Sequence, residues 1–289
     1  MLWDKSTDDG LEPDGVGNIS APTTSRRPPP DGEPQCLPTI DGWGVVTVES
    51  VGVTERVRQV RKRMQAAQRR SPIAQHAQPV LLLAATKGAS LIQVRAAIDA
   101  GVDAIGESRL QELTSKFGAW RPPVQCHFIG RLQRNKVRLA LQWCAMIQSV
   151  DSLPLAEAIH ARHLELCAAD GSTPPTGRAI LVQVNVAGEA TKGGFLPEEL
   201  EAAVERMATW PGLAVEGLMA IPPYMVDPEG VRPYFRLMRE LARRIADRGF
   251  SGVSMATLSM GMSHDFEVAI EEGATMVRIG TALFGDRTP

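Results

Sequence analysis

Residues 80–87 read Val-Leu-Leu-Leu-Ala-Ala-Thr-Lys, an apolar run that ends in a hydroxyl and an amine. A short, continuous apolar run of this kind is typical of a strand that is buried on both faces of a parallel sheet. We therefore expect a core strand that delivers Lys87 to one edge of the sheet.

Seven further strand-like runs follow, and helical patterns separate them. The eight runs begin on average 28 residues apart, which suits consecutive βαβ units with right-handed crossovers. Eight such units predict a single (β/α)8 barrel of the TIM type. A doubly wound open sheet is the alternative, but regular units without a long hydrophobic edge favour closure. The runs begin near Val80, Ala104, Cys126, Met146, Ala179, Ala214, Ala256 and Met276.

The two ends of the chain indicate how the barrel is completed. Residues 1–44 hold seven of the 21 prolines and show no apolar periodicity, so we expect a disordered Pro/Gly-rich tail there and the barrel over residues 45–289. Only Ala282–Pro289 follow the eighth strand, too few for an eighth helix, and a leading helix is expected to replace it. The apolar stripe of that helix consists of Val53, Val57, Val60, Met64 and Ala67.

The composition excludes several classes of protein. The 289 residues include 31 Lys plus Arg and 33 Asp plus Glu, a net charge of −2 that provides no overall field to attract nucleic acid or an anionic membrane. The longest apolar run has six residues, whereas a membrane-spanning helix needs about 20. With no secretory signal pattern either, we expect a cytoplasmic protein without nucleic-acid or membrane partners. A basic cluster on the leading helix is interpreted as a solvated face: Arg56, Arg58, Arg61, Lys62, Arg63, Arg69 and Arg70.

Cysteine and histidine spacing indicates no metal site. Cys36, Cys126, Cys144 and Cys167 are separated by 90, 18 and 23 residues, so no metal-type or redox-type pair is present. The five histidines also lack partners at ligand spacing. We expect reduced, mostly buried thiols.

Working residues in such a barrel lie at the C-terminal ends of the strands, and the loops after strands seven and eight often hold a phosphate. Residues 258–263 read Leu-Ser-Met-Gly-Met-Ser and residues 277–281 read Val-Arg-Ile-Gly-Thr. Small residues let backbone amides approach an anion, hydroxyls add donors, and a helix that opens at 264–266 adds its positive end. This composition fits a phosphate cup, with two ordinary βα turns as the alternative.

Two cationic residues accompany this cup. Val277 and Ile279 would face the helices, which places Arg278 inside the barrel near its mouth. A charge there needs a partner, either a structural carboxylate or the ring nitrogen of a cofactor. Lys87 either reaches water or, with its pKa lowered by desolvation and nearby cations, forms a Schiff base. The amine, the arginine and the cup together match what pyridoxal phosphate requires.

The chain resembles the pyridoxal phosphate homeostasis proteins, which are related to the N-terminal barrel of alanine racemase. The resemblance spans about Val53–Gly285, and its motifs occur in the order of the family. They are Ala85–Lys87, Ile105–Glu112, His127–Lys136, Ser149–Ser152, Val184–Val186, Gly217–Met219 and Leu258–Gly285.

This resemblance implies that pyridoxal 5'-phosphate forms an internal aldimine with Lys87 and turns its pyridine nitrogen toward Arg278. Lys192, in the loop of residues 189–195, matches a family lysine associated with cofactor exchange, and a mobile surface lysine is the alternative. The residues implied at the phosphate are Ser259, Ser263, Gly280 and Thr281, and those beside the ring or behind it are Ile129, Asn185, Met219 and Met260.

Two positions depart from the family pattern. Ser108 stands where the family usually carries Asn after Gly-Glu, so a ring-side contact is expected to be shortened or replaced by water. His264 stands where many relatives have a small residue, and it either donates to the phosphate or points to solvent. The proline-rich tail is an addition to the family pattern.

Arg278 also bears on catalysis. Pyridoxal phosphate enzymes that make carbanions usually keep the pyridine nitrogen protonated through an acidic partner, and a guanidinium cannot accept that proton. Alanine racemase also employs a tyrosine from a second domain, whereas this chain ends eight residues after Thr281 and its tyrosines are Tyr224 and Tyr234. We expect a monomeric, non-catalytic protein that holds pyridoxal phosphate through Lys87 in cofactor homeostasis and delivers it to apo enzymes.

Two enzyme hypotheses stay open at this point. One is a pyridoxal phosphate-dependent amino-acid racemase or decarboxylase that uses the same aldimine, for which turnover of amino acids is the discriminating observation. The other is a Schiff-base aldolase without a cofactor, whose lysine binds substrate carbonyls directly and which would be colourless.

Overall fold

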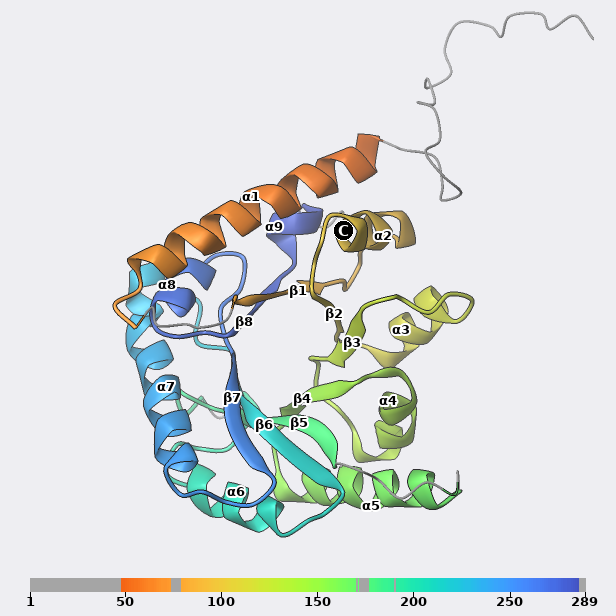
Figure 1. The fold of residues 1–289 in the computed structure, drawn as a ribbon, viewed down its shortest axis with the longest axis vertical. Helices are drawn as coiled ribbons and strands as arrows, with labels where there is room; N and C mark the ends of the chain where they lie inside the picture. The colour runs from red at the N-terminus through yellow and green to blue at the C-terminus, as the bar shows by residue number, and fades with distance from the viewer. Residues whose placement is uncertain (1–47, 74–78, 170, 172–176, 190, 286–289) are drawn as a thin grey trace, which may run out of the picture.

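The chain folds into a closed barrel of eight parallel strands, in which each strand pairs with its neighbours in sequence (Figure 1). The computed structural model describes residues 48–73, 79–169, 171, 177–189 and 191–285, so the tail expected over residues 1–44 lies outside the described residues. Closure of the sheet confirms the predicted (β/α)8 barrel and rules out the open doubly wound sheet.

All eight predicted strands are present. Pairing of β1 with β8 closes the ring and sets Leu83 opposite Arg278. The strands are β1 Leu81–Ala85, β2 Ala104–Glu107, β3 Gln125–Phe128, β4 Met146–Val150, β5 Arg178–Val184, β6 Leu213–Ala220, β7 Val253–Ser259 and β8 Met276–Ile279.

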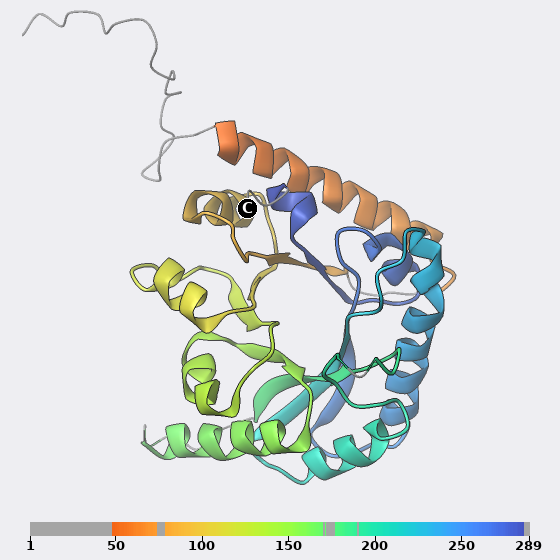
Figure 2. The same ribbon diagram turned by 180° about the vertical axis from the view of Figure 1, so that it is seen from behind.

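Helices surround the ring of strands, as Figures 1 and 2 show from opposite sides. Residues 134–136 and 228–231 form two short 3-10 turns, η1 and η2. The α-helices are α1 Val48–Arg70, α2 Leu91–Asp99, α3 Leu110–Phe117, α4 Val137–Trp143, α5 Leu153–Ala169, α6 Leu200–Ala208, α7 Arg232–Ala246, α8 Phe266–Glu271 and α9 Thr281–Phe284.

Helix α1 takes the place of a full-length helix after β8. It packs against α2, α8 and the four-residue α9 (Figure 1), and all five residues of its predicted stripe are at most 3% exposed. Its basic residues bond to this same fold, since Arg56 donates to the Leu283 carbonyl while Arg63 and Arg70 pair with Glu267 and Glu271. The leading helix is therefore confirmed, and much of its basic cluster serves to attach it.

A chain of polar side chains crosses the barrel interior among apolar ones. The Arg278 guanidinium donates to the Ser259 hydroxyl (2.7 Å), which donates to Gln148 Oε1 (2.6 Å). Gln148 Nε2 in turn lies 2.8 Å from His127 Nδ1. These four residues come from β8, β7, β4 and β3, so the chain ties opposite sides of the barrel together. Apolar residues fill the rest, in two clusters around Leu83, Ala104 and Met276 and around Met146, Leu181 and Met219.

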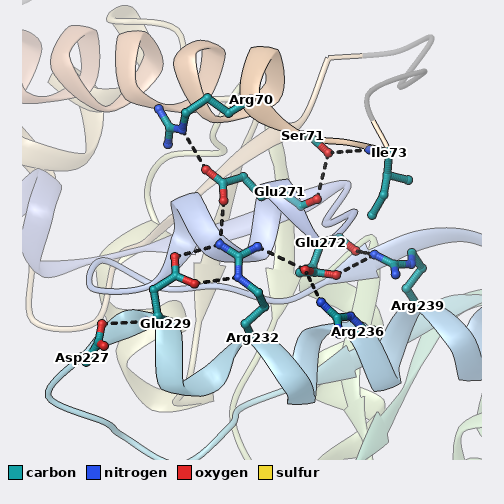
Figure 3. A network of polar contacts seen from close by, with 10 residues as sticks. All are labelled: Arg70, Ser71, Ile73, Asp227, Glu229, Arg232, Arg236, Arg239, Glu271 and Glu272. Atoms are coloured by element: carbon teal, nitrogen blue, oxygen red, sulfur yellow. Dashed lines mark hydrogen bonds and ion pairs between the residues drawn. The ribbon is translucent and has the colours of Figure 1, made fainter.

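An ion-pair network joins α1, η2, α7 and α8 on the outside of the barrel (Figure 3). Arg232 donates to Glu229 (2.7 Å), Glu271 (2.7 Å) and Glu272 (3.1 Å). Glu272 also accepts from Arg236 and Arg239. Burial alone would raise the pKa of Glu272, but hydrogen bonds from the three arginines lower it below its ordinary value. The network thus joins α1 and α7 to the C-terminal end of α8.

The cysteines differ in one respect from the prediction. Cys126 and Cys144 are buried as expected, yet their thiols are hydrogen-bonded, and that bond together with burial raises the pKa of Cys126. The 18-residue separation concealed a contact between β3 and the end of α4. Cys36 lies outside the described residues.

None of the helices in the described part of the chain is long and apolar enough to cross a membrane. Within the described ranges, no group of three or more His, Cys, Asp and Glu side chains is placed to hold a metal ion.

Candidate functional site

Lys87 lies two residues beyond β1, at the edge where all eight strands end. Its side chain is half-buried. No hydrogen bond or ion pair engages its amine among the residues that the structure describes. An amine in this position, beside the barrel mouth and without a polar partner, is available to a ligand.

The backbone on either side of Lys87 is held firmly. The Thr86 amide donates to the Gly106 carbonyl (3.0 Å), and its hydroxyl donates to Glu107 Oε1 (2.5 Å). The Gly88 amide donates to Glu112 Oε1 (2.5 Å). The chain therefore fixes the position of the Lys87 Cα while leaving the amine itself unbound.

Lys116 on α3 holds this arrangement together. Its ammonium donates to the Thr86 carbonyl (2.7 Å), to Glu107 (2.8 Å) and to Glu112 (3.2 Å). Burial raises the pKa of Glu107, and hydrogen bonds from Lys116 and Thr86 oppose that rise. Glu107 Oε2 has no hydrogen-bond partner within the described residues, so the Lys116 charge is the main compensation for a buried carboxyl group.

Sequence reasoning missed the role of Lys116. In the sequence, Glu107 and Glu112 stand out only as members of the motif Ile105–Glu112. The available signals were a charged residue in a strand whose pattern is otherwise buried, and a Glu112–Lys116 pair at helical i,i+4 spacing.

Arg278 points into the barrel, as predicted, and is only 4% exposed. Its guanidinium donates to the Ser259 carbonyl (2.6 Å), the Ser259 hydroxyl (2.7 Å) and the Ala220 carbonyl (2.8 Å). In the described part of the chain no carboxylate forms an ion pair with it, so the structural carboxylate considered above is not found there. A guanidinium has five N–H donors, and these three bonds leave two for a ligand.

Burial also tunes the charge on Arg278. It lowers the pKa of the guanidinium to about 10, and attraction to Asp265 partly opposes the shift. Arg278 therefore remains a cation at neutral pH, and a ring nitrogen placed against it would be a hydrogen-bond acceptor.

The loops after β7 and β8, where the sequence predicts the phosphate cup, meet in the structure. The Ala282 amide donates to the Ser263 hydroxyl (3.1 Å), and the Arg278 amide donates to the Gly261 carbonyl (3.0 Å). A Cβ atom on Gly280 would lie 3.4 Å from the Ala85 carbonyl oxygen, so the cup adjoins the end of β1 and thus Lys87. Ser263 and Gly280 are half-buried and Thr281 is exposed.

Ser259 lies below this cup. Its side chain is completely buried, and its hydroxyl accepts from Arg278 and donates to Gln148. The predicted phosphate residues Ser263, Gly280 and Thr281 come together at the mouth, whereas the Ser259 hydroxyl is already engaged within the polar chain.

The four residues expected beside the ring occupy different surroundings. Ile129 packs against the inner cluster around Leu83, and Met219 belongs to the second inner cluster. Met260 lies in the main core with the helices. The structure thus places two of the three apolar side chains within the barrel and Met260 outside that interior.

Asn185 organises the loop that carries Lys192. Its side-chain amide donates to the carbonyls of Glu189 (3.0 Å) and Lys192 (3.4 Å), and its oxygen accepts from the Glu189 amide (3.2 Å). The Lys192 ammonium pairs with Glu189 Oε1 at 2.7 Å. A cavity of about 150 Å³ adjoins Asn185 and Lys192. Lys192 is therefore an ion-paired residue of a braced loop beside the mouth.

His264 connects two loops of the mouth. Its Nε2 lies 3.0 Å from the Met225 carbonyl and 3.2 Å from the Val226 carbonyl, and its ring contacts Tyr224. The side chain is exposed, as the solvent alternative expects, and the backbone contacts of Nε2 are an addition that neither alternative included. Tyr224 itself is 78% exposed.

A larger cavity of about 870 Å³ opens at the ends of β2, β3 and β4. Residues 108–111, 131–136 and 151–155 provide most of its lining, and Ser108 is among them. The strands β2, β3 and β4, whose following loops line the cavity, lie on the other side of the ring from β7 and β8 (Figure 1). It depends on three separate loops, so periodicity in the sequence did not indicate it.

Residues 56–288 match the protein family described as alanine racemase, N-terminal domain. A solved structure of alanine racemase from Clostridium difficile shares this fold with a TM-score of 0.60 and 15% identity, over 81% of this chain and 58% of that one. The chain therefore belongs to the class of proteins with an alanine racemase N-terminal domain.

Relatives within this class are considerably more similar. The pyridoxal phosphate homeostasis protein of Aquifex aeolicus is 43% identical over 81% of this chain and 97% of its own length. PipY of Synechococcus elongatus, solved with pyridoxal phosphate bound, is 28% identical with a TM-score of 0.67, over 81% of this chain and all of that one. The chain belongs to the family of pyridoxal phosphate homeostasis proteins.

Proposed function

We propose that this protein binds pyridoxal 5'-phosphate at the barrel mouth and acts in the homeostasis of that cofactor. The observation that carries the proposal is the unpartnered amine of Lys87, which lies on a firmly held backbone beside the cup of Ser263, Gly280 and Thr281. The names of the relatives and the bound cofactor in PipY support it. The cofactor would supply an aldehyde that condenses reversibly with an amine.

The residues of the mouth suit the parts of this cofactor. The half-buried hydroxyl of Ser263 and the loop amides are suited to a phosphate dianion. Arg278 offers two unused donors inside the barrel, and a permanent cation there favours an unprotonated ring nitrogen. Because an unprotonated ring is a weak electron sink, the arrangement favours holding the cofactor over turning over amino acids.

Delivery of the cofactor to apo enzymes, a cytoplasmic location and a monomeric state belong to the same proposal. The proposal includes a part for Lys192 in cofactor exchange, and the cavity that its loop shares with Asn185 supports it. The alternative of a racemase or decarboxylase has less support, since Tyr224 lies on an exposed loop against His264.

A visible absorption spectrum with added pyridoxal phosphate tests the proposal. Wild type should develop a yellow band that Lys87→Ala lacks, and borohydride reduction followed by peptide mass mapping should place the adduct on Lys87. Lys62→Ala, an exposed lysine of α1, serves as the control and should behave like wild type. A wild type that stays colourless would contradict the proposal, and steady-state turnover of an amino-acid panel would support the enzyme alternative instead.

A further inference from the structure

The 870 Å³ cavity at the ends of β2, β3 and β4 has the size of a small-molecule site, which typically measures about 300–1,000 Å³. Its walls come from three loops that follow neighbouring strands, so it opens at the same end of the barrel as the cup. The cup, however, is formed by the loops after β7 and β8, on the other side of the ring (Figure 1).

The lining of this cavity is strongly basic. Arg109, Arg131, Arg134 and Lys136 all contribute to it, and Asp151 is the single carboxylate among its lining residues. In the part of the chain that the structure describes, none of these four cations takes part in a side-chain hydrogen bond or an ion pair. By contrast, the nearby Lys116 has two carboxylate partners. Arg109 is close enough to Glu112 to help lower the pKa of that carboxyl group, but four cations against a single lining carboxylate still create a local field that attracts anions.

The backbone that carries these cations is well anchored. A Cβ atom on Gly130 would lie 2.1 Å from the Ser108 carbonyl oxygen, so the loops after β2 and β3 are in close contact. The Ser149 hydroxyl donates to the Gly130 carbonyl, and Leu132 is buried between the arginines. A site whose walls are already in place loses less conformational entropy when a ligand binds.

We propose that this cavity binds a small polyanion with at least two phosphate or carboxylate groups, at a site separate from the cofactor cup. Arg131 and Arg134 would each hold an anionic group through two parallel N–H donors, and Lys136 and Arg109 would add charge. The concave shape and the volume favour a small molecule over the flatter surface of an acidic protein. This inference does not depend on the cofactor proposal, because neither Lys87, Arg278 nor any residue of the phosphate cup lines the cavity.

Isothermal titration of the full-length protein with pyrophosphate at low ionic strength tests the site. Wild type should bind pyrophosphate, and the double substitution Arg131→Gln/Arg134→Gln should weaken binding at least tenfold. Arg138→Gln is the matched control, because Arg138 is exposed on α4 but does not line the cavity. Far-UV circular dichroism and thermal unfolding should be alike for both variants and wild type, since the substituted side chains are exposed.

Further titrations decide which of the two sites binds pyrophosphate and which class of ligand the cavity prefers. Lys87→Ala should bind pyrophosphate as wild type does, and saturating pyridoxal phosphate should leave that binding intact. Loss of pyrophosphate binding on addition of pyridoxal phosphate would assign it to the cup and overturn the inference. Absence of binding to wild type, equal binding to the double variant, or tighter binding of a poly-glutamate peptide than of pyrophosphate would overturn it as well.

Discussion

At the scale of single residues, the surroundings of Lys87 fix its backbone and leave its amine unbound. Thr86 and Gly88 are bonded to the fold, while the amine between them is left to a ligand. The Thr86 hydroxyl donates to Glu107 and the Gly88 amide donates to Glu112. The Lys116 ammonium compensates for the charge of both carboxylates. Lys116, which the sequence analysis did not single out, therefore supports the position of Lys87, which it did.

Substitution Lys116→Met should be strongly destabilising. It leaves the buried Glu107 carboxyl without its cation, and breaking a buried pair costs about 3–5 kcal/mol. Urea unfolding at neutral pH measures the loss, and the exposed Lys62→Met on α1 is the control. The pKa of Glu107 should rise further, so the deficit should shrink at acidic pH. A variant as stable as wild type would show that the Lys116 charge is not needed.

His127 should make the protein sensitive to mild acid. Burial lowers its pKa to about 4 from an ordinary 6.5. As pH falls, His127 takes up a proton in the unfolded chain at a higher pH than in the folded protein. The stability of the folded state is therefore unaffected by His127 above pH 6.5 and decreases as pH falls from 6.5 towards 4. The expected loss between pH 7 and pH 5 is about 2 kcal/mol.

Comparing urea unfolding of wild type and His127→Gln at pH 7 and pH 5 isolates this effect. Glutamine keeps an acceptor for Gln148 but does not titrate, so the variant should lose about 2 kcal/mol less than wild type over that interval. Equal pH dependence of the two proteins would contradict the burial argument for His127.

At the scale of elements, the turn after β7 depends on one glycine. Gly261 has a φ of +92°. A Cβ there would lie 2.6 Å from the Ala269 Cβ and 3.0 Å from the Phe266 Cα. The turn therefore brings α8 close to the cup only because the position lacks a side chain.

Gly261→Ala should destabilise the fold and weaken cofactor binding together. Gly249→Ala is the matched control, since Gly249 also has a positive φ (+64°) but nothing within 4 Å of an added Cβ. Both carry the backbone strain of about 1 kcal/mol, and Gly261→Ala adds a steric cost. Thermal unfolding and titration with pyridoxal phosphate measure both effects. Equal behaviour of the two variants would refute the close approach.

The elements themselves were largely predictable from the sequence, and their interior contacts were not. Apolar runs and helical stripes reveal strands and helices because burial acts on one residue at a time. Gln148 and His127 meet only because of the register of β3 and β4, which no local pattern specifies. Lys116 and the 870 Å³ cavity likewise depend on how separate loops fold over the ends of the strands. Lys87 and Arg278 were placed correctly because each adjoins or lies within an unambiguous strand.

At the scale of the whole molecule, charged contacts join segments that are distant in sequence. The network of Figure 3 links Arg70, Arg232 and Glu272 through direct or shared partners. It thereby fastens α1 and α7 to α8, the last helix before β8. The attachment of these helices to one another rests partly on this network.

Glu272→Ala should lower the free energy of unfolding by about 1–3 kcal/mol, because it removes the shared acceptor of three arginines. Glu240→Ala, an exposed residue of α7, is the control. The pKa of Glu272 lies below its ordinary value, so its contribution is present above pH 4.5 and is lost as pH falls through its folded-state pKa. Urea unfolding at pH 7 should separate the two variants, and identical curves would contradict the role of the network.

The position of α1 has a consequence for the order of events during synthesis. Its contacts with α2 can form early, but α8 and α9 follow about 200 residues later along the chain. At about 5–20 residues per second, the ribosome needs roughly 10–40 s to supply them. Throughout that interval part of the apolar stripe of α1 has no partner and is a surface for a chaperone. Helix α1 is therefore synthesised before α8 and α9 but completes its packing only with them.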